Sequence, residues 1–497
     1  MSTPATTATP SEKNWGQKYG LILGAVALLA LLLMPTPAGL PVAGQRMLSI
    51  LVFSVIIWMT EAVPYPVSAA IIMSLMAFML GTAPDVAAPT KLMGTSKGLT
   101  MALGGFANTA WALVAAALFL AVAMTKTGLD RRIALIVLSK MGAKTNRVLI
   151  GVIIVGLVLS FFVPSTTARV ACMVPIVLGI IKAFNVPLKS RFAGILMIAT
   201  AQADSIWNTS IKTAAAQNMI AVGFIEKILG YNITWLEWFK ASFPFGVLMA
   251  IALYWTLMKL MPPEVDEVPG GEETIRREMA NLGPMTPPEK KLLAISLTLL
   301  FFWATEKIVH PFDTSSTTIV AITLMLMPGF GIMTWKEAQE KIAWGTVLLF
   351  GVGISLGSAI LSTKAASWLA NVIVSTTGIQ TMSPIMILAI MAAFLIIIHL
   401  GFASATALAA ALIPLVISVL QGVQTPGINV IGMTMILQYV VSFGFILPVN
   451  APQNMIAYGT DTFSVRDFIR TGVPLTIIAY GLIMLLGATY WKWLGLV

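Results

Sequence analysis

Charged residues are scarce in this chain, and their scarcity excludes a soluble protein. Only 10% of the 497 residues are Asp, Glu, Lys or Arg, whereas soluble domains carry roughly 25%. With 58% hydrophobic residues and a mean hydropathy of +0.90, a soluble fold would have too little polar surface to expose to water. The apolar runs are continuous and do not alternate with polar residues as membrane β-barrel strands do. We therefore predict an all-α, polytopic membrane protein.

Cysteine and histidine are nearly absent, which excludes most metal and redox chemistry. Cys172 is the single cysteine, so it can form neither an internal disulfide nor a thiolate metal site. The two histidines, His310 and His399, cannot supply a His-rich metal centre. These residues assemble no nucleophile–base pair, so we expect no enzyme and no cofactor. The sequence also has no basic, aromatic-interleaved stretch of the kind that binds nucleic acid.

The net charge of +10 is gathered in short basic clusters between the apolar runs, a pattern that sets membrane topology. Residues 126–147 carry six Lys or Arg against one Asp, so we place this loop in the cytoplasm. Residues 1–18 form a predicted cytoplasmic tail. The apolar run that follows lacks a small-residue cleavage site, so we expect a retained helix and not a signal peptide. We predict about 11 spans in a bacterial inner membrane.

A polar break interrupts the apolar segment 148–181 at Pro164-Ser165-Thr166-Thr167-Ala168-Arg169. Basic clusters flank this segment on both sides, so it is either a re-entrant hairpin with the break at its tip or two full spans. The arms have about 16 and 12 residues, and a full span needs about 20. The shorter arm favours the hairpin. A span is also expected over 241–261.

The next segment, from about residue 192, is rich in polar side chains at membrane depth. Backbone that leaves the helix is tolerated there only where protein or water satisfies it. We therefore expect a broken helix beside the hairpin. Its polar residues are Asp204, Asn208, Thr209, Lys212, Thr213, Gln217 and Asn218.

Three motifs recur in the second half of the chain in the same order, at offsets of 245, 239 and 236. Such a register indicates duplication. The second break lacks the basic flanks of the first, so its hairpin should enter from the opposite side, as in an inverted-topology repeat. We divide the chain into the tail 1–18, repeat 1 at 19–261, a charged linker at 262–291 and repeat 2 at 292–497. The motif pairs are Trp58-Met59-Thr60-Glu61 with Trp303-Ala304-Thr305-Glu306, Ser165-Thr166-Thr167-Ala168 with Ser404-Ala405-Thr406-Ala407, and Gln217-Asn218-Met219-Ile220-Ala221 with Gln453-Asn454-Met455-Ile456-Ala457.

Matched polar breaks in two halves of a membrane protein predict a substrate site near the midplane. Hydroxyls and the free N–H groups at helix starts bind a carboxylate without fixed charge. Helix–helix packing is the alternative for the hydroxyls, and interhelical hydrogen bonding for the amides, but the repetition favours a site. The predicted substrate-binding residues are Ser165, Thr166, Thr167, Ser404, Ala405, Thr406, Gln217, Asn218, Gln453 and Asn454.

Arg169, Lys212 and His399 are candidates for compensating the charge of a bound anion. A charged side chain at membrane depth costs at least ~2.5–3.5 kcal/mol and is a functional hypothesis by default. The alternatives stay open. The structural alternative for Arg169 is a side chain that snorkels to the basic surface or pairs with Asp204. The structural alternative for Lys212 is a pair with Asp204. The structural alternative for His399 is a buried histidine whose hydrogen bonds are satisfied within the fold.

The repeated motifs resemble the divalent anion/sodium symporter family of di- and tricarboxylate transporters, over essentially the whole chain beyond residue 18. In that family each hairpin tip reads Ser-Asn-Thr, and its serine and threonine bind a substrate carboxylate. The resemblance carries this role to Ser165, Thr167, Ser404 and Thr406. It also implies a homodimer in the lipid bilayer that works by an elevator motion.

The chain departs from the family pattern at positions that matter for sodium. In sodium-coupled members the middle asparagine of each tip helps to coordinate sodium, and here Thr166 and Ala405 replace it. The family's proline pair before the later asparagine is also weakened, to Ala216-Gln217 and Pro452-Gln453. These departures resemble exchanger-type members, so bound sodium is possible but not expected.

The sequence therefore predicts a secondary transporter that exchanges small dicarboxylates of the succinate, malate, fumarate, 2-oxoglutarate or citrate class. A sodium-coupled dicarboxylate symporter is the alternative. An anion channel is less compatible with the sequence, because the polar residues cluster at two points and do not form a continuous stripe.

Overall fold

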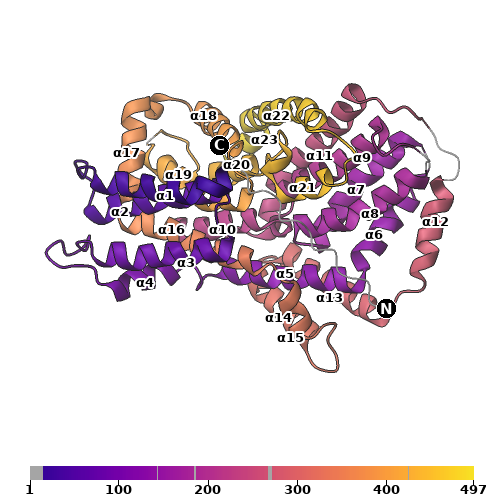
Figure 1. Cartoon of the computed structure of the whole chain (residues 1–497), viewed down its shortest axis with the longest axis horizontal. Helices are drawn as coiled ribbons and strands as arrows, with labels where there is room; N and C mark the ends of the chain where they lie inside the picture. Colours follow the sequence, from indigo (N-terminus) through magenta and orange to yellow (C-terminus); the bar gives the residue numbers. More distant parts are fainter. Residues whose placement is uncertain (1–14, 143, 184–185, 267–270, 424) are drawn as a thin grey trace.

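The computed structural model describes residues 15–142, 144–183, 186–266, 271–423 and 425–497. Most of this part of the chain is helical (Figure 1). Nine of the described helices are long and apolar enough to cross a membrane, and four further apolar helices are shorter. The predicted all-α, multi-span class is thereby confirmed.

The first half begins with helices that form a framework around the later hairpins. α1 starts at Trp15, within the predicted tail 1–18, and residues 1–14 lie outside the described residues. The Trp58 indole donates to Ser68 Oγ over 3.1 Å and joins α2 to α3. The helices are α1 (Trp15–Leu33), α2 (Val42–Met59), α3 (Tyr65–Leu75, continued by η1, Met76–Leu80), α4 (Thr95–Leu103), α5 (Thr109–Thr127) and α6 (Leu129–Ser139).

The first polar break is the tip of a helical hairpin made by α7 (Thr145–Phe162) and α8 (Thr166–Ala183). Each arm has 18 residues and meets the length criterion for a span. The predicted arm of 12 residues was wrong because Arg169 lies inside α8 and does not interrupt it. Arm length alone therefore does not distinguish a re-entrant hairpin from two spans.

The predicted broken helix is present directly after this hairpin. α9 (Arg191–Ser210) stops at Ile211, a 3₁₀ turn follows at Lys212–Ala214, and α10 (Ala216–Leu229) continues. α11 (Trp235–Leu260) then begins six residues before the span expected at 241–261.

The second half contains the same kinds of elements in the same order. The Trp303 indole donates to Thr318 Oγ1 over 3.1 Å, which matches the Trp58 contact and supports the pairing of these motifs. The elements are α13 (Pro287–Thr305), α14 (Thr314–Leu326), α15 (Trp335–Lys341), α16 (Trp344–Ser362), α17 (Ala365–Thr377), η3 (Ile379–Thr381), the hairpin α18 (Pro384–His399) and α19 (Ala405–Gly422), the broken helix α20 (Val430–Val441), η4 (Pro448–Asn450) and α21 (Pro452–Tyr458), and finally α22 (Val465–Ala488) and α23 (Tyr490–Trp493).

The charged linker folds against the basic loop of the first half. It contains α12 (Gly271–Leu282), and α13 already begins at Pro287, inside the predicted linker 262–291. Arg132 pairs with Glu289 over 2.7 Å, and Arg131 pairs with Glu278 over 2.7 Å. The linker and the 126–147 loop therefore lie on one side of the molecule.

The two hairpins approach the middle of the molecule from opposite directions. Figure 1 shows α7 and α8 toward one end of the long axis and α18 and α19 toward the other. α8 packs against α9 and α21, and α19 packs against α10 and α20. The second arm of each hairpin thus contacts the broken helices of both halves, which brings the two tips together.

Candidate functional site

A cavity of about 370 Å³ lies where the two hairpin tips meet the two helix breaks. It brings together eight of the ten residues predicted to bind substrate, although the two tips are 239 positions apart in the sequence. The described lining has no acidic side chain, which leaves the space suitable for an anion. The lining residues are Tyr65, Leu118, Pro164, Ser165, Thr166, Thr167, Ala168, Ala171, Ala216, Gln217, Lys341, Ala343, Thr346, Leu349, Ser404, Ala405, Thr406, Ala451, Pro452 and Gln453.

Helix starts surround this cavity. α8, α10 and α19 all begin with residues that line it. The N–H groups of a first helical turn lack partners inside the helix and carry partial positive charge. Ser165 Oγ accepts from Ala168 N and Ser404 Oγ accepts from Ala407 N, each over 3.3 Å, so the two serines cap their helices identically. The cavity is therefore electropositive without a charged side chain at either tip.

The glutamines of the repeated motif connect the two halves across the cavity. Gln217 Nε2 donates to Ser442 Oγ over 3.4 Å, and Gln453 Nε2 donates to Ser205 Oγ over 3.0 Å. Each bond joins the broken helix of one half to that of the other. Both glutamines also line the cavity, so their remaining polar groups can face a ligand.

The asparagines of the same motif lie behind the cavity and do not line it. Asn218 and Asn454 are fully buried. Asn218 Nδ2 donates to the carbonyl oxygens of Asn208 and Ile211, and Asn454 Nδ2 donates to that of Gly444 over 2.8 Å. These amides satisfy backbone groups that the broken helices leave without helical partners.

Arg169 is the centre of a buried network beneath the first tip. Its guanidinium donates to the carbonyl oxygen of Val163, to that of Ala214 over 2.9 Å, and to Asn208 Oδ1. It also forms a buried ion pair with Asp204. Of the alternatives for Arg169, the structure contains the Asp204 pair. Because the pair is neutral, Arg169 adds no net positive charge to the cavity.

Asn450 has the corresponding position beneath the second tip. Its Nδ2 donates to the carbonyl oxygens of His399 over 2.9 Å, Leu400 over 3.3 Å and Phe402 over 3.1 Å. The His399 ring is buried, does not line the cavity, and its two nitrogens have no hydrogen-bond partner among the described residues. At both tips, backbone carbonyl oxygens therefore accept hydrogen bonds from a side chain.

Lys212 lies at the break between α9 and α10 but away from the cavity lining. Its Nζ donates to the carbonyl oxygen of Ile233 over 2.6 Å, and its side chain is buried. Asp204, the partner that the sequence suggested for Lys212, is bonded to Arg169 instead. The alternative in which Lys212 pairs with Asp204 is not present in the structure, because Arg169 reaches that carboxylate from the adjacent hairpin arm.

Three polar residues of the cavity were not identified from the sequence: Tyr65, Lys341 and Thr346. They come from α3, from the last residue of α15 and from α16. None belongs to a repeated motif, and Lys341 ends the charged stretch Trp335–Lys341, which is typical of an ordinary surface helix. No local signal in the sequence would have found them.

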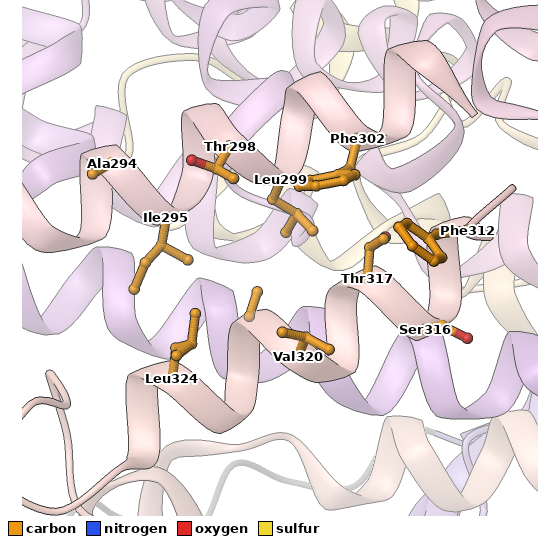
Figure 2. A pocket seen from close by; sticks show the side chains of 11 residues that line it. Ala294, Ile295, Thr298, Leu299, Phe302, Phe312, Ser316, Thr317, Val320 and Leu324 are labelled. Carbon is orange, nitrogen blue, oxygen red and sulfur yellow. The ribbon is translucent and has the colours of Figure 1, made fainter. Parts of the chain in front are cut away.

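A second groove, of about 420 Å³, lies between α13 and α14 (Figure 2). Figure 2 shows a lining that is mostly hydrocarbon, with visible hydroxyls on Thr298 and Ser316, and Thr317 is the third hydroxyl residue of the lining. It contains no charged residue, amide or helix start directed at an anion. We therefore place the candidate site at the tips, where polar groups from both halves converge.

Comparisons with known proteins were consistent with this architecture. A family described as "Sodium:sulfate symporter transmembrane region" matches residues 15–497. The chain is 55% identical to a protein of Cupriavidus necator named only "Membrane protein", over 96% of this chain and 93% of that one. It is 27% identical to the sodium-dependent dicarboxylate transporter SdcS of Staphylococcus saprophyticus, over 95% and 91%. It is 25% identical to the citrate/succinate antiporter of Escherichia coli K12, over 94% and 97%.

The fold also has a counterpart among solved structures. The YdaH transporter of Alcanivorax borkumensis matches with a TM-score of 0.55 at 14% identity, over 85% of this chain and 97% of that one. Because the family match covers nearly the whole sequence, the chain belongs to the sodium:sulfate symporter family, the divalent anion/sodium symporters that its motifs resemble, and it is an integral multi-pass membrane transporter and not an enzyme.

Proposed function

We propose that this protein is a secondary transporter that exchanges small dicarboxylates. The observation that carries the proposal is the convergence of two matched Ser-x-Thr tips on one cavity without an acidic lining residue. Hydroxyls of Ser165, Thr167, Ser404 and Thr406, with the helix starts of α8, α10 and α19, would bind the carboxylates. Relatives named as a dicarboxylate transporter and as a citrate/succinate antiporter support this substrate class.

We further propose that the chain contains two inverted-topology repeats, at 19–261 and 292–497, whose hairpins are re-entrant. The opposite directions of the hairpins in Figure 1 and the matched tryptophan contacts support this division. Broken helices with a site between the repeats are typical of such transporters. The basic loop 126–147 and the linker would then face the cytoplasm of a bacterium.

Exchange is favoured over sodium coupling because the backbone carbonyl oxygens at the tips already accept hydrogen bonds from side chains. In transporters of this kind, unwound backbone carbonyls coordinate the coupling ion. Here Arg169 already binds the carbonyl oxygens of Val163 and Ala214, and Asn450 binds three carbonyl oxygens at the second tip. A sodium ion would have to displace these buried donors. The named sodium-dependent relative keeps the symporter as the alternative.

The proposed exchange cycle follows from the charge of the cavity. An empty cavity surrounded by helix starts is electropositive and would cross the hydrocarbon core at high cost. A bound dianion would offset this charge and permit the crossing, so that outward movement of one dianion is required for inward movement of another. We propose that the hairpins and broken helices make this movement as an elevator in a homodimer.

Uptake of labelled succinate into proteoliposomes tests the proposal. Two conditions are crossed: internal unlabelled succinate present or absent, and an inward sodium gradient present or absent. Exchange predicts uptake that saturates, requires internal succinate and ignores sodium. Uptake into empty vesicles that is driven by sodium would establish the symporter instead, and non-saturating uptake without counterflow would indicate a channel.

A further inference from the structure

Lys341 is the one charged side chain in the described lining of the cavity. It is the last residue of α15 (Trp335–Lys341), directly before α16, and its side chain is exposed. The cavity is therefore open to solvent at this point. The other lining residues are uncharged, so the ammonium group of Lys341 provides the fixed positive charge that the Arg169–Asp204 pair does not.

The helix that carries Lys341 leaves its ammonium group unpaired. Glu337 lies four residues earlier, the usual spacing of a helical ion pair. However, Glu337 pairs with Lys126 from α5, whose Nζ lies 2.7 and 2.6 Å from the two carboxylate oxygens. Glu337 also accepts from Thr334 N and Oγ1 at the helix start. Lys341 forms no ion pair with a carboxylate in the described part of the chain.

The Lys126–Glu337 pair persists over the physiological pH range. The hydrogen bond from Lys126, followed by those from Thr334, lowers the pKa of Glu337 to about 2. Glu337 is therefore ionised and engaged at every pH at which a dicarboxylate is a dianion. Lys341 has no competing intramolecular carboxylate on its own helix at that position.

The first half has no charged residue at the place that corresponds to Lys341. α15 precedes α16 as α4 precedes α5, but the segment before α5, residues 104–108, reads Gly-Gly-Phe-Ala-Asn and has no charge. Lys126 connects α15 to the end of α5, where the basic loop 126–147 starts. Lys341 thus lies on the basic-loop side of the cavity.

We propose that Lys341 binds the carboxylate of the substrate that points away from the hairpin tips, and that it does so only while the cavity opens toward the basic-loop side. This inference rests on the proposed exchange of dicarboxylates. The tips supply neutral donors for one carboxylate, and Lys341 supplies a cation for the other. Because α15 belongs to neither hairpin, tips that move toward the opposite face leave Lys341 behind. The result is selectivity for dianions and a higher affinity on one face than on the other.

Succinate counterflow by the Lys341→Gln variant, measured separately from each face of the membrane, tests this inference. The orientation of the protein in proteoliposomes is established by protease cleavage of the 262–291 linker. The half-saturating concentration of succinate is then measured separately from each face. On the basic-loop face it should rise about tenfold, which corresponds to about 1.4 kcal/mol. On the opposite face it should change less than twofold. The preference for succinate over its monomethyl ester should fall on the basic-loop face alone.

The matched control is Lys336→Gln, which removes an exposed lysine from the same helix outside the cavity lining. It should leave both faces unchanged, and Lys341→Arg should retain most of the affinity. The inference would be overturned if Lys341→Gln weakened succinate binding equally on the two faces. It would also be overturned if Lys341→Gln left both faces unchanged, as expected for Lys336→Gln. If the wild-type protein shows no counterflow, the proposed exchange itself fails. Normal wild-type counterflow with an unaffected variant refutes the role of Lys341 alone.

Ionic strength supplies a second measurement that needs no substitution. Salt screens an exposed ammonium–carboxylate contact more strongly than a buried one. For the wild-type protein, raising the salt concentration should therefore weaken succinate binding more on the basic-loop face than on the opposite face. Equal salt dependence on the two faces would contradict the inference even if Lys341→Gln could not be purified.

Discussion

The network around Arg169 makes a quantitative prediction about stability. Replacing Arg169 with Ala leaves Asp204 buried without its cation and removes the donor to the carbonyl oxygens of Val163 and Ala214. Breaking a buried ion pair by removing one partner costs about 3–5 kcal/mol, and each buried acceptor left without a donor costs about 1–3 kcal/mol. We therefore expect Arg169→Ala to lower the free energy of unfolding by at least about 4 kcal/mol.

A double-mutant cycle separates the charge from the hydrogen bonds. Arg169→Met combined with Asp204→Asn leaves no buried charge, so it should be more stable than Arg169→Met alone. The remaining loss should come from the carbonyl oxygens. The coupling between the two substitutions should lie at the upper end of the range of about 0.5–3 kcal/mol for contacting residues.

Detergent-titrated unfolding of the purified protein measures these differences. The control is Arg191→Met, which removes an exposed arginine whose partner is Glu264 and should change the free energy of unfolding by less than about 1 kcal/mol. Strictly additive effects at Arg169 and Asp204, or an Arg169→Ala variant as stable as the wild-type protein, would refute the assignment of this pair as a buried structural centre.

Two further predictions separate binding residues from structural ones. The double variant Ser165→Ala and Ser404→Ala should abolish succinate binding in calorimetry while the protein stays folded, because each serine contributes a helix cap of only about 1 kcal/mol; transport at the wild-type rate would show that the site assignment is wrong. Lys212→Ala should lower thermal stability but leave the affinity of the folded protein unchanged, because Lys212 bonds the Ile233 carbonyl away from the cavity. Its control, Lys189→Ala, removes an exposed pair with Asp461 and should alter neither property. A loss of affinity without a loss of stability would return Lys212 to the site.

The resident side chains at the tips give a physical reason why one family can contain both symporters and exchangers. A carbonyl cluster at a helix break needs a donor or a cation, since a buried unpaired carbonyl is unfavourable. In this chain Arg169 and Asn450 supply donors that cannot dissociate. We propose that such built-in donors replace the dissociable ion and so remove the ion from the transport cycle.

The amino-acid sequence by itself determined the all-α membrane class and located the polar tips, and it predicts the repeat. A scarcity of charge fixes the membrane environment, because apolar surface on this scale has no stable place in water. The repeated Ser-x-Thr and Gln-Asn motifs stand out because polar residues are rare in these apolar runs. They led to eight residues that share one cavity.

Only the tertiary structure decided which polar residues meet. From the sequence, Asp204 could pair with either Arg169 or Lys212. Because α8 packs against α9, Asp204 pairs with Arg169. Asn218 and Asn454 directly follow the cavity glutamines in the sequence, but they are buried outside the cavity lining. Lys341 enters the cavity through the packing of elements distant in sequence, a property that no local pattern encodes.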